Sequence, residues 1–229
     1  MRLKKWESIP EFMKNMAVKD YYDSLKKKEL GLILKRIFDI VFSIVGLLIL
    51  TPLFILIAIL IKLSSKGPIF FLQTRITQFG RQFKIIKFRT MVTHAEELGL
   101  LVTSNHDSRI TKFGSLLRKF RIDEIPQLFN ILIGDMSFVG TRPEVLKYVN
   151  CYSDEMYATL LLPAGVTSKT SIEYKNETEL LNETQDPEKT YIEVILPQKM
   201  KINLSSLQKF SFFDDIVTII RTVINVFFG

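Results

Sequence analysis

Two adjacent carboxylates, Asp123 and Glu124, lie in a stretch that is otherwise rich in arginine. They come just before Ile125-Pro126, a favourable start for a helix because proline is tolerated in the first turn. An acid in that position meets free backbone N–H groups and the positive end of the helix dipole, which we expect to lower its pKa. A carboxylate kept ionised in this way can act as a nucleophile. The alternative for such a pair is solvated surface charge.

Basic side chains come close to this pair along the chain. Arg118 precedes it, and Arg142 follows it in the turn GTRP. Lys87 and Arg89 lie earlier, in KIIKFRTM. Guanidinium groups bind phosphate through two parallel hydrogen bonds, and Mg²⁺ is readily shared between a carboxylate and a diphosphate. The pattern therefore predicts a diphosphate site with an anionic nucleophile. Basic surfaces that only attract anionic lipid are the alternative.

Composition narrows the class of partner. The chain has 229 residues, which suits one domain, and a net charge of +7, which implies an anionic partner. Cys151 is the only cysteine, so an internal disulfide framework is excluded. His94 and His106 lack the spacing of a zinc helix. No nucleic-acid-binding motif accompanies the positive charge, so we expect no nucleic acid partner.

The apolar residues are concentrated in one run, residues 37–63. Its length suits a transmembrane helix, but lysine and arginine flank both ends, which would place both ends in the cytoplasm. Pro52 divides the run into two limbs, each shorter than the ~30 Å hydrocarbon core of a bilayer. Thr51 can satisfy a carbonyl freed by the proline. A re-entrant helix fits these features better than a spanning helix, although the residues alone leave both open.

The remaining pattern predicts short elements. Residues 69–72 and 83–86 form a hairpin around a turn at Gly80. Helices are expected at 91–101, 111–120 and 126–132, with an amphipathic helix near residues 6–16. The C-terminal stretch SFFDDIVTIIRTVINVFFG is amphipathic and begins with a capping box. It either packs on a soluble core or lies on a membrane surface.

The order of several short motifs resembles the bacterial sugar transferases, the small monotopic phosphoglycosyl transferases. The resemblance covers about residues 35–167. Its motifs are KRIFDIV (35–41), Thr51-Pro52, GPIFFLQTR (67–75), KFRTM (87–91), DSRITKFGSLLR (107–118), IDEIPQLFNIL (122–132) and GDMSFVGTRPE (134–144).

The resemblance implies a reaction. The family transfers a sugar-1-phosphate from a UDP-sugar to polyprenyl (undecaprenyl) phosphate and releases UMP. The position of Asp123 is that of the nucleophile, which forms a covalent phosphosugar intermediate and lies beside Mg²⁺, with Glu124 assisting. Arg118 and Arg142 match positions that contact the donor phosphates. Lys87, Arg89 and Gln127 complete the expected substrate-binding set.

The resemblance also implies a location and an architecture. We expect a mostly helical α+β protein on the cytoplasmic face of the bacterial inner membrane, in contact with lipids of the inner leaflet and possible as a homo-oligomer. Its expected parts are an N-terminal basic extension (1–34), a re-entrant membrane helix hairpin (35–66) with its kink at Thr51-Pro52, a small cytoplasmic catalytic domain (67–209) and an interfacial helix (210–229).

The chain departs from the family pattern after the GTRP turn. The turn at Pro163 has an inserted residue and lacks a second glycine, and the tryptophan and Asn-Gly-Arg segment that commonly follow are absent. These changes concern how the sugar or uridine is held, and they leave the acid pair intact. They also motivate a second hypothesis, a non-catalytic scaffold or lipid-binding homologue in the same pathway.

Overall fold

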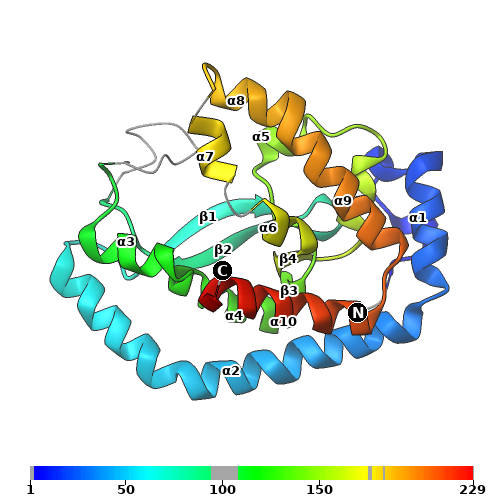
Figure 1. Ribbon diagram of the computed structural model, residues 1–229. Helices are drawn as coiled ribbons and strands as arrows, with labels where there is room; N and C mark the ends of the chain where they lie inside the picture. Colours follow the sequence, from blue (N-terminus) through cyan, green and yellow to red (C-terminus); the bar gives the residue numbers. More distant parts are fainter. Residues whose placement is uncertain (1–2, 94–107, 175–176, 183, 229) are drawn as a thin grey trace.

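The computed structural model describes residues 3–93, 108–174, 177–182 and 184–228, which form a mostly helical α+β fold (Figure 1). Most of the helix predicted at 91–101 lies outside the described residues. The helices and strands are α1 (Met16–Lys26), α2 (Glu29–Ser64), β1 (Phe70–Ile76), β2 (Gln82–Phe88), α3 (Lys112–Lys119), α4 (Gln127–Ile133), β3 (Met136–Val139), α5 (Leu146–Val149), β4 (Ala164–Thr167), α6 (Lys169–Glu173), α7 (Glu177–Asn182), α8 (Pro187–Thr190), α9 (Leu196–Gln208) and α10 (Phe212–Phe228).

Helix α2 is the longest element, and most of its surface is uncovered. Leu48 and Ile49, near its middle, are 71% and 70% exposed. Among the described residues it is the one helix long and apolar enough to cross a membrane. Figure 1 shows it as an arc with the other elements on its concave side. Pro52 lies inside it without ending it, and Thr51 Oγ1 donates to the Leu47 carbonyl at 2.7 Å. The predicted hairpin is thus one continuous helix.

Polar residues fasten the N-terminal half of α2 to the rest of the protein. Arg36 donates to the carbonyls of Ile131 and Leu132, at 2.6 and 2.8 Å, where α4 ends. Asp39 Oδ1 accepts from the Phe138 N–H of β3 at 3.1 Å. These bonds satisfy a helix end and a strand N–H that would otherwise be buried without partners.

The C-terminal half of α2 packs on the same globular part through apolar contacts. Ile57 and Ile61 are buried in one cluster with Phe88 of β2 and Leu117 of α3. Both halves of α2 therefore contact elements that follow it in the chain.

The described part of the fold contains two small two-stranded sheets. β1 and β2 pair antiparallel, with Phe70 opposite Phe88, which confirms the predicted hairpin. β3 and β4 pair parallel. The helix predicted at 111–120 is also confirmed as α3, whose first turn is capped by Thr111 Oγ1 accepting from the Gly114 N–H at 2.9 Å. Helix α4 ends as predicted at Gly134, whose φ of 92° suits glycine.

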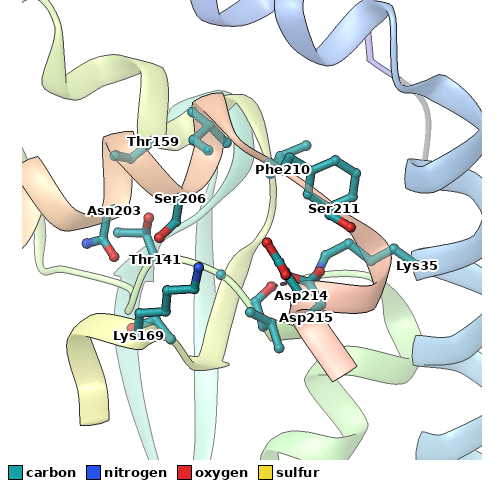
Figure 2. A pocket seen from close by; sticks show the side chains of 15 residues that line it. Lys35, Thr141, Thr159, Lys169, Asn203, Ser206, Phe210, Ser211, Asp214 and Asp215 are labelled. Atoms are coloured by element: carbon teal, nitrogen blue, oxygen red, sulfur yellow. Dashed lines mark hydrogen bonds and ion pairs between the residues drawn. The ribbon is translucent and has the colours of Figure 1, made fainter. Parts of the chain in front are cut away.

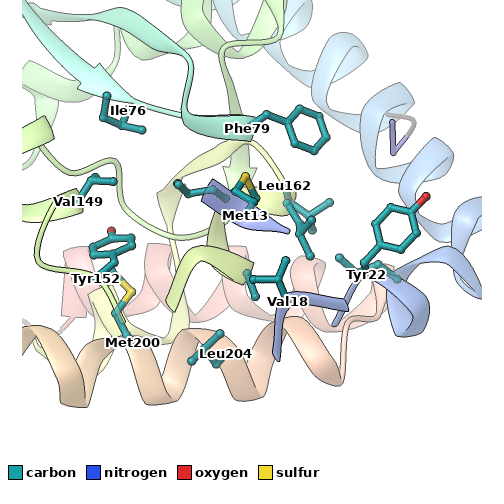
Figure 3. Packing of buried hydrophobic residues seen from close by; sticks show 14 of the residues in the cluster. Met13, Val18, Tyr22, Ile76, Phe79, Val149, Tyr152, Leu162, Met200 and Leu204 are labelled. Atoms are coloured by element: carbon teal, nitrogen blue, oxygen red, sulfur yellow. The ribbon is translucent and has the colours of Figure 1, made fainter. Parts of the chain in front are cut away.

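The main core includes residues of the N-terminal segment, for which we predicted a basic extension over residues 1–34. Met13, Val18 and Tyr22 are buried in the same cluster as Met200 and Leu204 of α9 (Figure 3). The amphipathic helix expected near residues 6–16 is instead two 3-10 turns, followed by α1. This segment is therefore part of the globular fold.

Helix α10 turns its polar side toward the protein. Asp215 pairs with Lys35 of α2 at 2.5 Å, Thr222 bonds with Thr167 of β4 at 2.7 Å, and Thr218 is buried. The apolar side of the helix is largely exposed, at Phe213, Val217, Ile220, Val223 and Ile224. This orientation is the reverse of a helix that packs its apolar side on a soluble core.

Candidate active site

Asp123 and Glu124 lie in a 3-10 turn, Ile122–Glu124, between α3 and α4. Both side chains are nearly buried, at 8% and 9% exposure. The alternative hypothesis, that the pair is solvated charge on the surface, is therefore wrong. Arg121, just before them, has a φ of 53°, in the left-handed region that a side chain rarely adopts. A strained residue beside two buried acids is typical of a functional site.

Basic side chains surround Glu124. Its Oε1 accepts from Lys87 Nζ at 2.8 Å and from Arg142 Nη2 at 2.9 Å, and Arg121 Nη1 lies 3.8 Å from Oε2. Burial raises the pKa of Glu124, but Arg142, Lys87 and Arg121 outweigh burial and hold that pKa well below its ordinary value. Glu124 is therefore a fixed anion that organises the cations around it.

Asp123 has the opposite environment. Within the part of the chain that the structure describes, its carboxylate makes no hydrogen bond or ion pair with another side chain. Burial and the neighbouring Glu124 raise its pKa to about 6, against the opposing charges of Lys87, Arg118 and Arg142. The lowered pKa that we expected at a helix start is therefore wrong in direction for Asp123, whereas the pKa of Glu124 is lowered, mainly by the cations around it. The group is still mostly ionised at neutral pH.

Of the predicted substrate-binding residues, all but Arg89 lie at or near the dyad. Lys87 and Arg142 contact the dyad, and the charge of Arg118, in the last turn of α3, acts on Asp123. Gln127, the first residue of α4, is 2% exposed, and its Nε2 has no partner within the described chain. Gln127 lines the same cavity as Glu124.

Arg89, also predicted to bind substrate, makes its hydrogen bonds elsewhere. Its guanidinium donates to the carbonyls of Ser65 and Lys66 at 2.7 and 3.0 Å, and to Ser65 Oγ at 2.8 Å. These groups follow the last residue of α2, Ser64. Arg89 therefore closes the end of the long helix instead of facing the acid pair. Conversely, Arg121 joins the site although it was not predicted to, because its proximity to Glu124 depends on the unusual backbone turn.

Two cavities meet beside the dyad. One, of about 660 Å³, is largely apolar and is lined by Leu50 of α2, Val226 of α10 and Glu124. The other, of about 210 Å³, is polar and is lined by Arg142. Arg121 and Ser171 line both.

The dyad alone does not provide a complete set of metal ligands within the described residues. Among the described residues no group of three or more His, Cys, Asp or Glu side chains is placed to hold a metal ion. Mg²⁺ is commonly held by one or two carboxylates together with substrate phosphates and water. Asp123, which is mostly ionised and has no side-chain partner among the described residues, fits that role, whereas Glu124 Oε1 accepts from two cations.

Comparison with known proteins adds the family. Residues 30–229 match the family described as Bacterial sugar transferase. The chain belongs to this family. The match extends beyond the motifs that end near residue 167 and includes α6 to α10.

Individual relatives of this bacterial sugar transferase have named activities. The chain is 39% identical over 153 residues to the UDP-N-acetylgalactosamine-undecaprenyl-phosphate N-acetylgalactosaminephosphotransferase of Aeromonas hydrophila. The matched stretch covers 62% of this chain and 36% of that protein. The chain is 30% identical over 221 residues to the UDP-glucose:undecaprenyl-phosphate glucose-1-phosphate transferase of Escherichia coli K12, covering 95% of this chain and 45% of that one. The chain thus spans less than half the length of both. With the exopolysaccharide production protein ExoY of Rhizobium meliloti it shares 30% identity over 86% of each chain.

Proposed function

We propose that this protein transfers a sugar-1-phosphate from a UDP-sugar to undecaprenyl phosphate, with release of UMP, and so begins the assembly of a surface glycan. Asp123 Oδ attacks the β-phosphorus, and the bond from that phosphorus to the bridging oxygen breaks as UMP leaves. A phosphate oxygen of the polyprenyl phosphate then attacks the same phosphorus and displaces Asp123, which regenerates the carboxylate. The observation that carries this proposal is the buried carboxylate of Asp123, which has no side-chain partner in the described part of the chain, beside the carboxylate of Glu124, which binds Lys87 and Arg142.

The electrostatics of the dyad suit this chemistry. Glu124 keeps Arg142 and Lys87 in place at 2.9 and 2.8 Å, so these donors are already ordered when a diphosphate arrives. Asp123 is left free to approach phosphorus. Asp123 would hold Mg²⁺ when the donor is bound, and the ion would neutralise charge on the donor phosphates. Arg118 and Arg142 offset the repulsion between the Asp123 carboxylate and the donor diphosphate.

The apolar cavity supports a lipid acceptor. It reaches from Glu124 to Leu50, next to the Thr51-Pro52 step, and to Val226 of α10. Leu48 on α2 and Val223 on α10 are exposed nearby in sequence. A polyprenyl chain that enters from a bilayer around these helices would meet the dyad without crossing water.

The arrangement of α2 supports a protein that enters one leaflet without crossing. A straight spanning helix would carry its far end about 30 Å away, on the other side of the bilayer. Here Arg36 near one end and Ile61 near the other both pack on the same globular part. We infer that both ends are cytoplasmic, that α2 dips into the inner membrane, and that α10 lies at its surface.

The experiment that tests the proposal is UMP release by the purified protein. It uses a panel of UDP-sugars with Mg²⁺ and undecaprenyl phosphate, and compares wild type with Asp123→Asn. Asp135→Asn is the matched control, since Asp135 pairs with Arg81, away from the dyad. We expect release from at least one UDP-sugar by wild type and by the control, and none by Asp123→Asn. Folded, membrane-bound wild type that releases no UMP from any of them would favour the scaffold hypothesis.

A further inference from the structure

The polar cavity has a wall made by the part of the chain that departs from the family motifs. One side is formed by Arg121 and Arg142, next to the dyad. The other side is formed by α6, α7 and α9, through residues such as Thr170, Lys199 and Asn203. This segment follows residue 167, and it lacks the tryptophan and the Asn-Gly-Arg stretch expected there. The acid pair and Arg142 thus lie within the short motifs of the family pattern, while this wall lies beyond them, in a part of the chain that the family match still includes.

A buried polar network holds the wall rigid. Lys199 Nζ donates to Glu177 Oε2 at 2.8 Å and to the Tyr191 hydroxyl at 3.3 Å. The Tyr191 hydroxyl in turn donates to Glu144 Oε1 at 2.6 Å. Glu144 ends the GTRPE stretch that carries Arg142. The wall is therefore tied directly to the turn that presents a phosphate-binding arginine.

Asn203, which lines both the polar cavity and a neighbouring cavity of about 60 Å³, has hydrogen-bonding capacity left over. The residue is 7% exposed, and its Oδ1 accepts from Thr170 Oγ1 at 2.7 Å. Its Nδ2 carries two N–H donors, and its partner among the described residues is the Met200 sulfur at 3.9 Å, a weak acceptor. A buried amide with an almost unused donor is costly unless a ligand engages it.

We propose that this cavity holds the sugar ring of the donor and that Asn203 selects the sugar. The inference rests on the proposed function, because it places the donor β-phosphate between Asp123 and Arg142. The sugar is bonded to that phosphate, and the cavity opens beside Arg142.

Chemistry favours the sugar over the uridine. Sugar hydroxyl and acetamido groups both donate and accept hydrogen bonds, and the ion pair of Lys199 with Glu177 and the amide of Asn203 match them. Uracil presents flat apolar faces, and this lining is mainly polar. A site that hydrogen-bonds a substrate group rejects analogues that lack it more strongly than an apolar pocket does.

The test measures donor preference. kcat/KM is measured for UDP-glucose, UDP-galactose and their 2-acetamido counterparts, with full-length wild type, Asn203→Ala and Thr159→Val. Thr159 is a matched control, because it is a buried threonine that lines the smaller neighbouring cavity of about 60 Å³ and not the polar one (Figure 2). Inhibition by UDP and the KM for undecaprenyl phosphate are measured alongside.

We expect Asn203→Ala to lower kcat/KM for the preferred UDP-sugar by about 10-fold or more and to narrow the preference among the four. For Asn203→Ala, inhibition by UDP and the KM for undecaprenyl phosphate should equal the wild-type values. The Thr159→Val protein should match wild type in all of these measurements. If Asn203→Ala does not fold, Thr170→Val carries the same expectation, since it removes the hydroxyl that orients Asn203.

Two results would overturn the inference. An unchanged preference would remove Asn203 from sugar selection. Equal weakening of all four UDP-sugars and of UDP would assign the cavity to uridine. These outcomes differ from failure of the proposed function, in which wild type itself releases no UMP.

Discussion

At the scale of single residues, the two neighbouring acids have different environments. Glu124 is compensated by Lys87, Arg142 and Arg121, whereas Asp123 is buried without a side-chain partner in the described chain. Burying an ionised carboxylate without a hydrogen-bonded partner opposes folding. A group kept in this state at a cost in stability is typical of a reactive residue.

Asp123→Asn should therefore stabilise the protein while it removes activity. The folded pKa of Asp123, about 6, lies above the ordinary value of 3.8. The unfolding free energy of wild type thus falls as pH rises from about 4 through about 6, and asparagine has no such dependence. Unfolding at pH 7.5 without Mg²⁺ or donor should show a gain on the order of 1–3 kcal/mol for Asp123→Asn. The gain should vanish near pH 4. If wild type and Asp123→Asn have the same unfolding free energy at pH 7.5 as well as near pH 4, Asp123 is not an uncompensated buried charge in the folded protein.

At the scale of elements, long-range contacts give similar residues different roles. Arg89 and Arg142 both lie in short motifs, KFRTM and GDMSFVGTRPE, and the sequence predicted a role in substrate binding for both. In the structure Arg89 closes the end of α2 and Arg142 holds Glu124. Spacing along a chain does not reveal this difference, because it depends on where α2 ends relative to β2.

Lysine substitution should separate the two arginines. Arg89→Lys loses the forked geometry that reaches Ser65 and Lys66 together, so it should lower the unfolding free energy by roughly 1–3 kcal/mol and leave the KM for UDP-sugar unchanged. Arg142→Lys should raise that KM by about 10-fold, because a point charge cannot replace bidentate phosphate binding. Thermal unfolding and steady-state kinetics on both proteins provide the check. A raised KM with normal stability for Arg89→Lys would restore its predicted role in the site.

Elements with strong local patterns were predictable from the sequence. The β1–β2 hairpin, α3 with its Thr111 cap, and α4 with its stop at Gly134 are confirmed. Elements defined by partners distant in sequence were not predictable. Met13 and Tyr22 gave no sign that they enter the core with α9, and Asn203 carries no motif. The acid pair was found from its neighbours, but the direction of the Asp123 pKa shift depends on burial, which the sequence does not show.

At the scale of the whole molecule, the apolar surfaces of α2 and α10 expose a large hydrophobic area. Exposed apolar patches of this extent mark a membrane or protein contact. The polar bonds of Arg36 and Asp39 fix α2 against α4 and β3, and the Lys35–Asp215 pair fixes α10 against α2. The molecule therefore presents these two helices together, and the cavity between them leads to the dyad.

Cysteine labelling should place both flanks of α2 in the cytoplasm. Lys27 and Lys66 are exposed, one at each end of the helix, so Lys27→Cys and Lys66→Cys are prepared in a Cys151→Ser background. A membrane-impermeant maleimide added to intact spheroplasts should label neither position, and both should react after lysis. Labelling of one position in intact cells would show that α2 crosses the bilayer.

The central claim is that Asp123 carries the phosphosugar, and the most direct measurement is the mass of the peptide that contains it. Wild type is incubated with Mg²⁺ and the UDP-sugar that supports UMP release, without acceptor, then digested under acidic conditions. We predict that this peptide gains the mass of a sugar-1-phosphate on Asp123, and that undecaprenyl phosphate removes it. UMP release only after the acceptor is added, with the peptide unmodified throughout, would contradict the account and indicate direct transfer.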